Sequence, residues 1–165
     1  GLAYVPEDRL GMGLVPSMSI LDNLLLTRER GLIPNRHNAR TEADQLINQF
    51  EIKANGPDHQ ARKLSGGNAQ KVLLARELTG GRTKTSVLVV CSPTRGLDVG
   101  AIETVRALLD DARSAGQAIL LISEDLDELM SLADRVLVLY SGQIVYETPG
   151  ETATLREVGA AMAGL

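Results

Sequence analysis

The stretch Leu64-Ser65-Gly66-Gly67-Asn68 has the residue types of a phosphate-binding loop. Two adjacent glycines let the backbone turn sharply and let a large anion approach without a Cβ in the way. The Ser65 hydroxyl can donate to that anion, and the apolar spacing over Ala69–Thr79 predicts a helix whose N-terminus points amide donors at it. The same five residues also fit a simple helix N-cap, in which Ser65 caps the helix and binds no ligand.

A short apolar run, Ser86–Cys91, is followed by a turn, Ser92–Asp98, and then by another helical pattern. Such a run is typical of a strand buried in a parallel sheet. With both segments present, the chain resembles the ATP-binding domain of ABC transporters. Leu64–Asn68 matches the LSGGQ signature of that family with Asn for Gln, and Pro93–Asp98 matches the segment after the Walker B strand, which carries the D-loop.

The stretch Pro6-Glu7-Asp8-Arg9 extends the resemblance to the start of the chain. In the resembling family this is the Q-loop region, and its sequence is typical of the second, C-terminal cassette of fused sugar and nucleoside importers. The resemblance implies that Glu7 stands where other cassettes have the Q-loop glutamine. From the residues alone, the stretch is an ordinary turn followed by a helix N-cap.

The composition indicates one domain or a large piece of one, because 165 residues with 44% hydrophobic content can bury one core. A net charge of -4 argues against nucleic acid as a partner, since a phosphate backbone requires clustered Lys and Arg. The single cysteine, Cys91, cannot form an internal disulfide and fits a reducing compartment. No apolar run reaches the length of a membrane span or signal peptide. We therefore expect a cytoplasmic protein that is peripheral on the inner face of the cell membrane.

The order of the periodic segments predicts an α/β fold with parallel strands. Ser17 or Ser19 can cap a helix that starts at Ile20 and ends near Gly31, with Pro34 preventing continuation. The polar stretch Lys53–Lys63 predicts a linker in which His59 is solvated, because no Cys or second His is spaced to join it as a metal ligand. The remaining expected elements are a strand in Gly1–Val5, helices in Thr41–Phe50, Val99–Ala115, Leu126–Ala133 and Glu151–Met162, a strand in Ala118–Ser123, and a hairpin of Val136–Tyr140 with Gln143–Tyr146.

The resemblance implies a partial P-loop NTPase core of the ABC ATPase type, with an α-helical subdomain that carries the signature. We expect a core strand and Q-loop region in 1–10, the helical subdomain in 11–80, and in 81–165 an α/β core with a degenerate Walker B, the D-loop and the switch region. In the family the exposed face of the helical subdomain meets the coupling helices of the membrane subunits, but a simply packed helical hairpin fits the same pattern. No GxxxxGK[ST] occurs, and Gly80–Thr83 fails because Arg76 stands at the first glycine position. We therefore expect the P-loop strand to be absent and to lie upstream in a longer polypeptide.

Three positions depart from the catalytic pattern of the family. Cys91 and Ser92 stand where the family has Asp and then Glu at the end of the Walker B strand, and Glu124 stands where it has the switch histidine. A thiol and a hydroxyl can neither hold Mg²⁺ nor polarise water at neutral pH, and a glutamate repels a γ-phosphate. We expect no intact catalytic residue and no metal ligand in the chain.

The signature is intact, and in ABC dimers the signature of one cassette closes over ATP held by the other. The resemblance thus implies that Ser65, Gly66, Gly67 and Asn68 contact nucleotide in trans and that Asp98 of the D-loop lies near the partner's nucleophilic water. ATP and Mg²⁺ are expected in the full-length assembly, which is an ABC-type ATPase, and none in the isolated fragment, which we expect to be inactive.

The implied partners are an N-terminal cassette of the same polypeptide or a second copy, together with transmembrane permease subunits. The fragment is also expected to self-associate, because its central strands require parallel neighbours. Two alternatives stay open: a non-catalytic coupling or dimerisation module of the transporter, and a soluble ABC ATPase of repair or translation.

Overall fold

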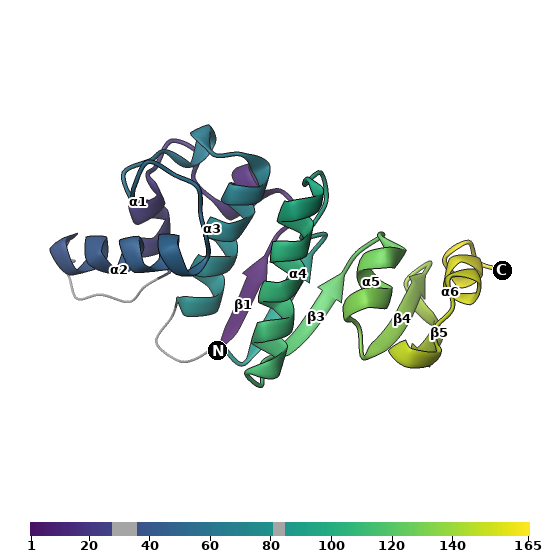
Figure 1. Ribbon diagram of the computed structural model, residues 1–165. Helices are drawn as coiled ribbons and strands as arrows, with labels where there is room; N and C mark the ends of the chain where they lie inside the picture. The colour runs from purple at the N-terminus through teal and green to yellow at the C-terminus, as the bar shows by residue number, and fades with distance from the viewer. Residues whose placement is uncertain (28–35, 81–84) are drawn as a thin grey trace. The chain divides into compact units, whose positions relative to one another are not determined.

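The computed structural model describes residues 1–27, 36–80 and 85–165, and these form two compact units, Gly1–Ile122 and Ser123–Leu165 (Figure 1). The prediction that the helix starting at Ile20 continues to near Gly31 is wrong, because this helix ends at Leu25 with Leu26 as its C-cap. Gly31 itself, Pro34 beyond it, and most of the stretch Gly80–Thr83 lie outside the described residues. The division into 1–10, 11–80 and 81–165 follows expected roles and stays a prediction.

The first unit contains a parallel sheet in the order β1-β2-β3, formed by β1 (Leu2–Val5), β2 (Val87–Cys91) and β3 (Ala118–Ile122). The register aligns Leu2 with Val87 and Val87 with Ala118, so β2 has a parallel neighbour on each side. The predicted parallel strands are therefore confirmed. Their carboxyl ends lie at one edge, which is where ligands bind in sheets of this class.

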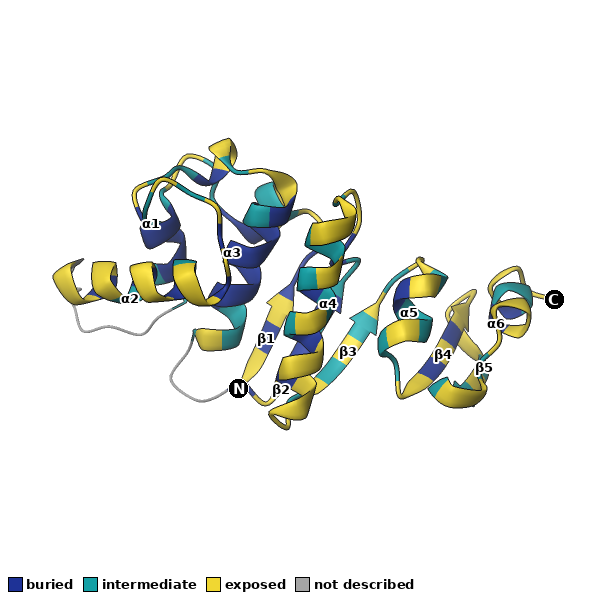
Figure 2. Cartoon of the chain, in the orientation of Figure 1, coloured by how far each residue is buried: buried dark blue, intermediate teal, exposed yellow. Residues whose placement is uncertain are grey.

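Residues along the strands of this sheet alternate in burial (Figure 2), so the two faces of the sheet differ. Side chains alternate along each strand, so one face carries Val5, Leu88 and Val90, which are fully buried. Helix α3 (Gly66–Thr79) packs against β1, and α4 (Val99–Ser114) packs against β3. The opposite face is apolar but exposed; its exposed side chains are Leu2, Tyr4, Val87, Leu120 and Ile122.

Two helices of the first unit start earlier than predicted. Helix α2 (Arg36–Gln49) begins before Thr41, because the Thr41 hydroxyl donates to the His37 carbonyl inside the helix and does not cap it. Helix α3 begins at Gly66 and not at Ala69, because Ser65 is its N-cap. Helix α1 (Ile20–Leu25) is capped by Ser19 and not by Ser17.

The stretch predicted to be a linker is tied to the start of α1. The Ile20 amide donates to the His59 carbonyl at 2.9 Å, and Gln60 forms a β-bridge with Ser19. The prediction that His59 is solvated is wrong: its Nδ1 accepts from the Asn55 amide at 3.1 Å, and its Nε2 is buried. A short 3₁₀ turn, Ala61–Lys63, then leads to the signature.

The second unit is a hairpin that packs with two helices. It consists of α5 (Leu126–Leu132), β4 (Arg135–Tyr140), β5 (Gln143–Pro149), a 3₁₀ turn (Gly150–Thr152) and α6 (Leu155–Met162). Ser141 and Gly142 both have positive φ, which fits the tight turn of a hairpin. Its core is Val136, Val138, Val158 and Ala161. Helix α6 starts at Leu155 and not at Glu151, because Thr154 is its cap.

Candidate functional site

The signature serine sits at the N-terminus of α3. The Ser65 oxygen accepts from the backbone amide of Asn68 at 3.4 Å and from its side-chain Nδ2 at 2.8 Å, so Ser65 is the N-cap of α3. Both lone pairs of the hydroxyl are used by these bonds, which leaves its proton to donate. Ser65 is exposed, and within the described part of the chain its hydroxyl donates no hydrogen bond. The cap therefore leaves Ser65 able to donate to an external anion.

Asn68, which replaces the glutamine of the family signature, connects this serine to the preceding loop. Its Oδ1 accepts from the Lys53 amide at 2.8 Å while its Nδ2 donates to Ser65. Each end of the side-chain amide therefore has one partner within the chain, while Nδ2 keeps a second proton. Asn68 orients Ser65 and the loop through these two bonds.

The two signature glycines lie within helix α3, so the prediction that the backbone turns sharply at them is wrong. Gly66 and Gly67 are the first residues of α3, and neither has a positive φ. Ser65, as the cap with extended φ and ψ, makes the change of direction. Gly67 is glycine because a Cβ there would lie 2.7 Å from the Cβ of Ala101 on α4, whereas a Cβ on the exposed Gly66 would fit at 3.4 Å.

The D-loop residue Asp98 is the N-cap of α4. Its Oδ1 accepts from the Ala101 amide at 2.9 Å, and its side chain is exposed. Gly96, two residues earlier, has a φ of 67°, which an L side chain rarely adopts. Because Gly67 packs on Ala101, the N-termini of α3 and α4 lie side by side. The structure thus brings Ser65 and Asp98 to neighbouring helix starts.

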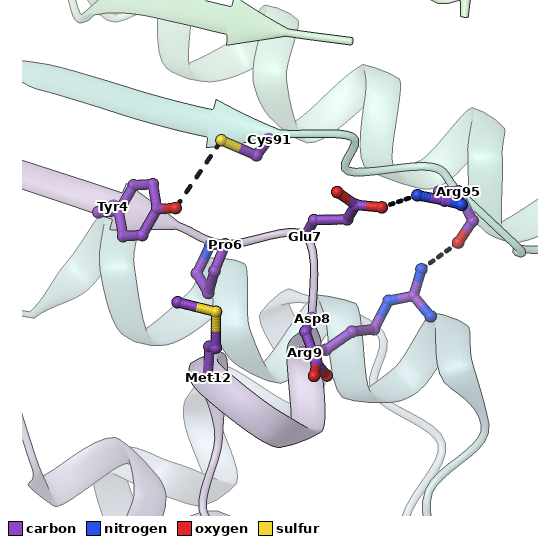
Figure 3. A pocket seen from close by; sticks show the side chains of 8 residues that line it. All are labelled: Tyr4, Pro6, Glu7, Asp8, Arg9, Met12, Cys91 and Arg95. Carbon is purple, nitrogen blue, oxygen red and sulfur yellow. Dashed lines mark hydrogen bonds and ion pairs between the residues drawn. The ribbon is translucent and has the colours of Figure 1, made fainter. Parts of the chain in front are cut away.

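A cavity of about 520 Å³ opens beyond the carboxyl ends of β1 and β2 (Figure 3). It is lined by Tyr4, Pro6, Glu7, Asp8, Arg9, Met12, Cys91 and Arg95. The structure therefore brings the predicted residues Glu7 and Cys91 into one cavity. Ser92 follows Cys91 with a φ of 42° and donates its amide to the Ile122 carbonyl at 2.8 Å, but it does not line the cavity.

The residues of this cavity do not fit Mg²⁺. Glu7 forms an ion pair with Arg95, and Asp8 accepts from the amides of Leu10 and Gly11 as the cap of a π-helical turn, Arg9–Gly13. The Cys91 Sγ lies 3.9 Å from the Tyr4 hydroxyl oxygen, and the hydrogen bond between these two groups raises the pKa of Tyr4 above its usual value. No group of three metal-ligand side chains is present in the described part of the chain.

Sequence reasoning missed a cluster formed by Arg9, Gln70 and Arg95. Arg9 Nε donates to Gln70 Oε1 at 3.0 Å. Figure 3 shows the second bond, in which Arg9 Nη2 donates to the Arg95 carbonyl. Burial lowers the pKa of Arg9 below its usual value, and the nearby Asp8 carboxylate opposes this in part. The sequence gives only one hint of this cluster, namely that Glu7 and Arg95 carry opposite charges and form an ion pair. Because these residues are far apart in the sequence, no spacing pattern predicts that they meet.

Glu124 belongs to the second unit and is exposed, one residue before Asp125, the cap of α5. The described helices include none that is long and apolar enough to cross a bilayer.

The chain is similar in sequence to curated import proteins. It is 39% identical to a glucose import ATP-binding protein of Haloferax volcanii, over 99% of this chain and 31% of that protein. It is 38% identical to a nucleoside import ATP-binding protein of Lactococcus lactis, over 99% of this chain and 33% of that protein. The chain thus spans about a third of the length of these relatives. No family model matches.

Solved structures agree in fold. An ATP-binding cassette solved as a dimer bound to ADP and Pi aligns with a TM-score of 0.73 at 22% identity, over 90% of this chain and 62% of that chain. An identity this low supports the fold alone. The chain therefore has the fold of the ABC ATPases and is similar, over nearly its whole length, to ATP-binding proteins of sugar and nucleoside import.

Proposed function

We propose that this chain is part of the ATP-binding subunit of a sugar or nucleoside importer. In this role its signature loop completes an ATP site whose P-loop belongs to another cassette. The relatives named for glucose and nucleoside import support the transport class, and the dimeric state of a solved cassette of this fold supports the pairing. We place the chain in the second, C-terminal cassette, as the Pro6–Arg9 sequence indicates.

The observation that carries the proposal is the state of Ser65. Its oxygen is fixed by two bonds from Asn68, its proton is left to donate, and it stands exposed at the N-terminus of α3. The unpaired amides and the dipole of a helix start favour an anion. Ser65 and the amides of Gly66 and Gly67 therefore present donors to a γ-phosphate, with Asp98 at the adjacent helix start.

The same chain provides little for its own ATP. A metal-bound triphosphate requires a carboxylate near the end of β2, and that position holds the Cys91 thiol followed by the Ser92 hydroxyl. Glu124, at the switch position, adds a negative charge. We therefore propose that the chain's own site is degenerate and that ATP and Mg²⁺ act in the assembly at the partner's P-loop.

The proposed partners are a second cassette, either N-terminal in the same polypeptide or a second copy, and transmembrane permease subunits. This arrangement places the protein on the cytoplasmic face of the membrane. Co-purification of permease subunits with the whole protein supports it, and a complete lack of such partners favours the soluble repair or translation class instead.

Ser65→Asp and Ser65→Asn test the proposal as a matched pair in the whole protein, assembled with its partners. Both side chains cap helices as well as serine does, but only Asp sets a negative charge against the phosphate. We expect Ser65→Asp to lower steady-state ATPase by about 10² to 10³, the usual loss for a transition-state donor, and Ser65→Asn to lower it far less. Ser92→Ala should leave turnover near normal.

The outcome that contradicts the proposal is near-normal turnover for Ser65→Asp. In that case the signature does not meet nucleotide, and the chain is a coupling or dimerisation module. Loss of turnover in Ser92→Ala, with Ser65→Asp active, would show that the catalytic role belongs to the end of β2.

A further inference from the structure

We propose that Arg9 is a positioning residue that holds the signature loop and the D-loop in fixed relation to each other. The inference rests on the proposed function, because it concerns how Ser65 and Asp98 reach the partner's nucleotide together. The structure supports it through three segments that meet at one guanidinium: the turn after β1, the start of α3 and the turn before α4.

The first connection joins Arg9 to α3. The Arg9 Nε donates a hydrogen bond to Gln70 Oε1 at a distance of 3.0 Å. Gln70 lies five residues after Ser65 and is only 1% exposed. The Nε2 of Gln70 is buried and has no partner among the described residues. Arg9 therefore provides the hydrogen bond recorded for this buried amide, and removing it would leave both polar atoms of Gln70 unsatisfied.

The second connection joins Arg9 to the D-loop turn. Its NH2 group donates to the carbonyl of Arg95, three residues before Asp98, while the Arg95 side chain forms an ion pair with Glu7. Arg95 is thus held twice by the turn after β1, through its carbonyl and through its side chain. That turn is itself fixed by Asp8, which caps it.

The position of Arg9 also brings it to the signature itself. A Cβ on Gly66 would lie 3.4 Å from Arg9 Nη1 and 3.4 Å from Leu97 Cδ2. Gly66, the first residue of α3, therefore lies between the Arg9 guanidinium and the D-loop. The planar guanidinium of Arg9 donates to Gln70 and to the Arg95 carbonyl at the same time, and this requires nitrogens held in a rigid arrangement. Lysine carries the same charge on a flexible side chain, but its single ammonium group cannot donate in the planar geometry of a guanidinium.

The cost of burial indicates that the contacts are specific. Arg9 is half-buried, its pKa is lowered by burial, and no salt bridge to a carboxylate is recorded for it in the described residues. Partial burial removes water from the guanidinium, which is unfavourable unless hydrogen bonds replace that water. The hydrogen bonds to Gln70 and Arg95 offset that loss.

The test is Arg9→Lys in the whole protein, with Arg113→Lys as the matched control. Arg113 pairs with Asp110 at 2.8 Å on the exposed side of α4, so the control removes another guanidinium from the same unit. Amide hydrogen exchange is measured at Ala69, Leu97 and Ala101, whose amides are bonded in the signature and D-loop segments. Steady-state ATPase kinetics are measured on the same samples.

We expect Arg9→Lys to raise exchange about 10-fold at all three amides and to lower kcat by about 10- to 100-fold, as a displacement of about 1 Å would. KM for ATP should stay within about 2-fold, because the other cassette binds the nucleotide. Gln70→Glu keeps the acceptor for Arg9 and should stay close to wild type, whereas Gln70→Met should behave like Arg9→Lys.

Exchange in Arg9→Lys equal to that in Arg113→Lys overturns the inference. So does raised exchange with an unchanged kcat, since the positioning would then have no catalytic consequence. The exchange measurement needs no ATP, so it separates this failure from that of the proposed function, which is decided by Ser65→Asp alone.

Discussion

Replacing Gly67 with alanine should force α3 away from α4. A Cβ at Gly67 lies 2.7 Å from the Cβ of Ala101, and ordinary contact begins at 3.4 Å, so the helices must separate by roughly 3.4 − 2.7 = 0.7 Å. Overpacking of this kind costs about 1–3 kcal/mol. Replacing glycine with alanine within a helix stabilises the folded state by about 0.5–1 kcal/mol, which offsets part of this cost. The expected net loss of stability is therefore between about 0 and about 2.5 kcal/mol.

The assay is urea unfolding followed by circular dichroism, with Gly100→Ala as the control. Gly100 is the second residue of α4 just as Gly67 is the second residue of α3, but a Cβ there meets Asp98 Oδ1 at an ordinary 3.6 Å. Gly100→Ala should be neutral or slightly stabilising. In the double variant Gly67→Ala/Ala101→Gly, the methyl group has moved from one helix to the other, and the stability should exceed the additive expectation by about 1 kcal/mol or more.

The double variant also separates packing from phosphate approach. If glycine at 67 serves only the contact with Ala101, the double variant should recover ATPase activity in the whole protein along with stability. Recovered stability without activity would show that the bare backbone at Gly67 is needed by the ligand. Additive losses in the double variant would refute the packing argument itself.

Two further predictions concern the 165-residue chain. It should show no Mg²⁺-dependent ATP hydrolysis above a protein-free blank, because it has no P-loop and carries Cys91 and Ser92 at the end of β2; turnover that survives purification to homogeneity would contradict this. It should also self-associate through the apolar face of its sheet, and Leu120→Lys, at a side chain 52% exposed, should shift sedimentation towards the monomer. A wild-type chain that stays monomeric over a wide concentration range would count against that face.

The elements were predictable wherever the apolar pattern is strong. The β-branched run at β2 and the amphipathic pattern of α4 each gave the observed element to within a residue or two. The start of α2 was not predicted, because Thr41 is a residue type common at helix starts. The start of α3 was left open, because Ser65 could cap the helix or lead into a turn at the two glycines. A hydroxyl can instead donate back along a helix, and two glycines can be helical when a serine before them provides the cap.

The site was predictable as a set of motifs but not as a set of contacts. Ser65 and Asp98 follow from spacing and resemblance. The contacts of Arg9 with Gln70 and of Gly67 with Ala101 join segments far apart in the sequence, and their residue types have no periodicity to reveal them. Pairings of this kind depend on the packing of α3, α4 and the turn after β1, which only the fold determines.

A carboxylate added at Ser92 should not restore metal binding, for reasons of charge placement. Glu7 is paired with Arg95, and Asp8 is used by the amides of Leu10 and Gly11, so neither is free to share a cation with the new side chain. Mg²⁺ needs near-octahedral oxygen ligands, and the neighbouring Cys91 thiol is a poor one.

Calorimetric titration of the Ser92→Glu chain with Mg²⁺ should therefore give no heat beyond that of wild type, while Cys91→Asp/Ser92→Glu also adds a carboxylate that lines the cavity and should bind measurably. Binding by the single variant would mean that Glu7 or Asp8 leaves its present partner for the ion. The signature requires no such rearrangement, since Ser65 is already exposed at the N-terminus of α3. Under the proposed function, that difference allows the signature half-site to act although Cys91 and Ser92 stand at the end of β2.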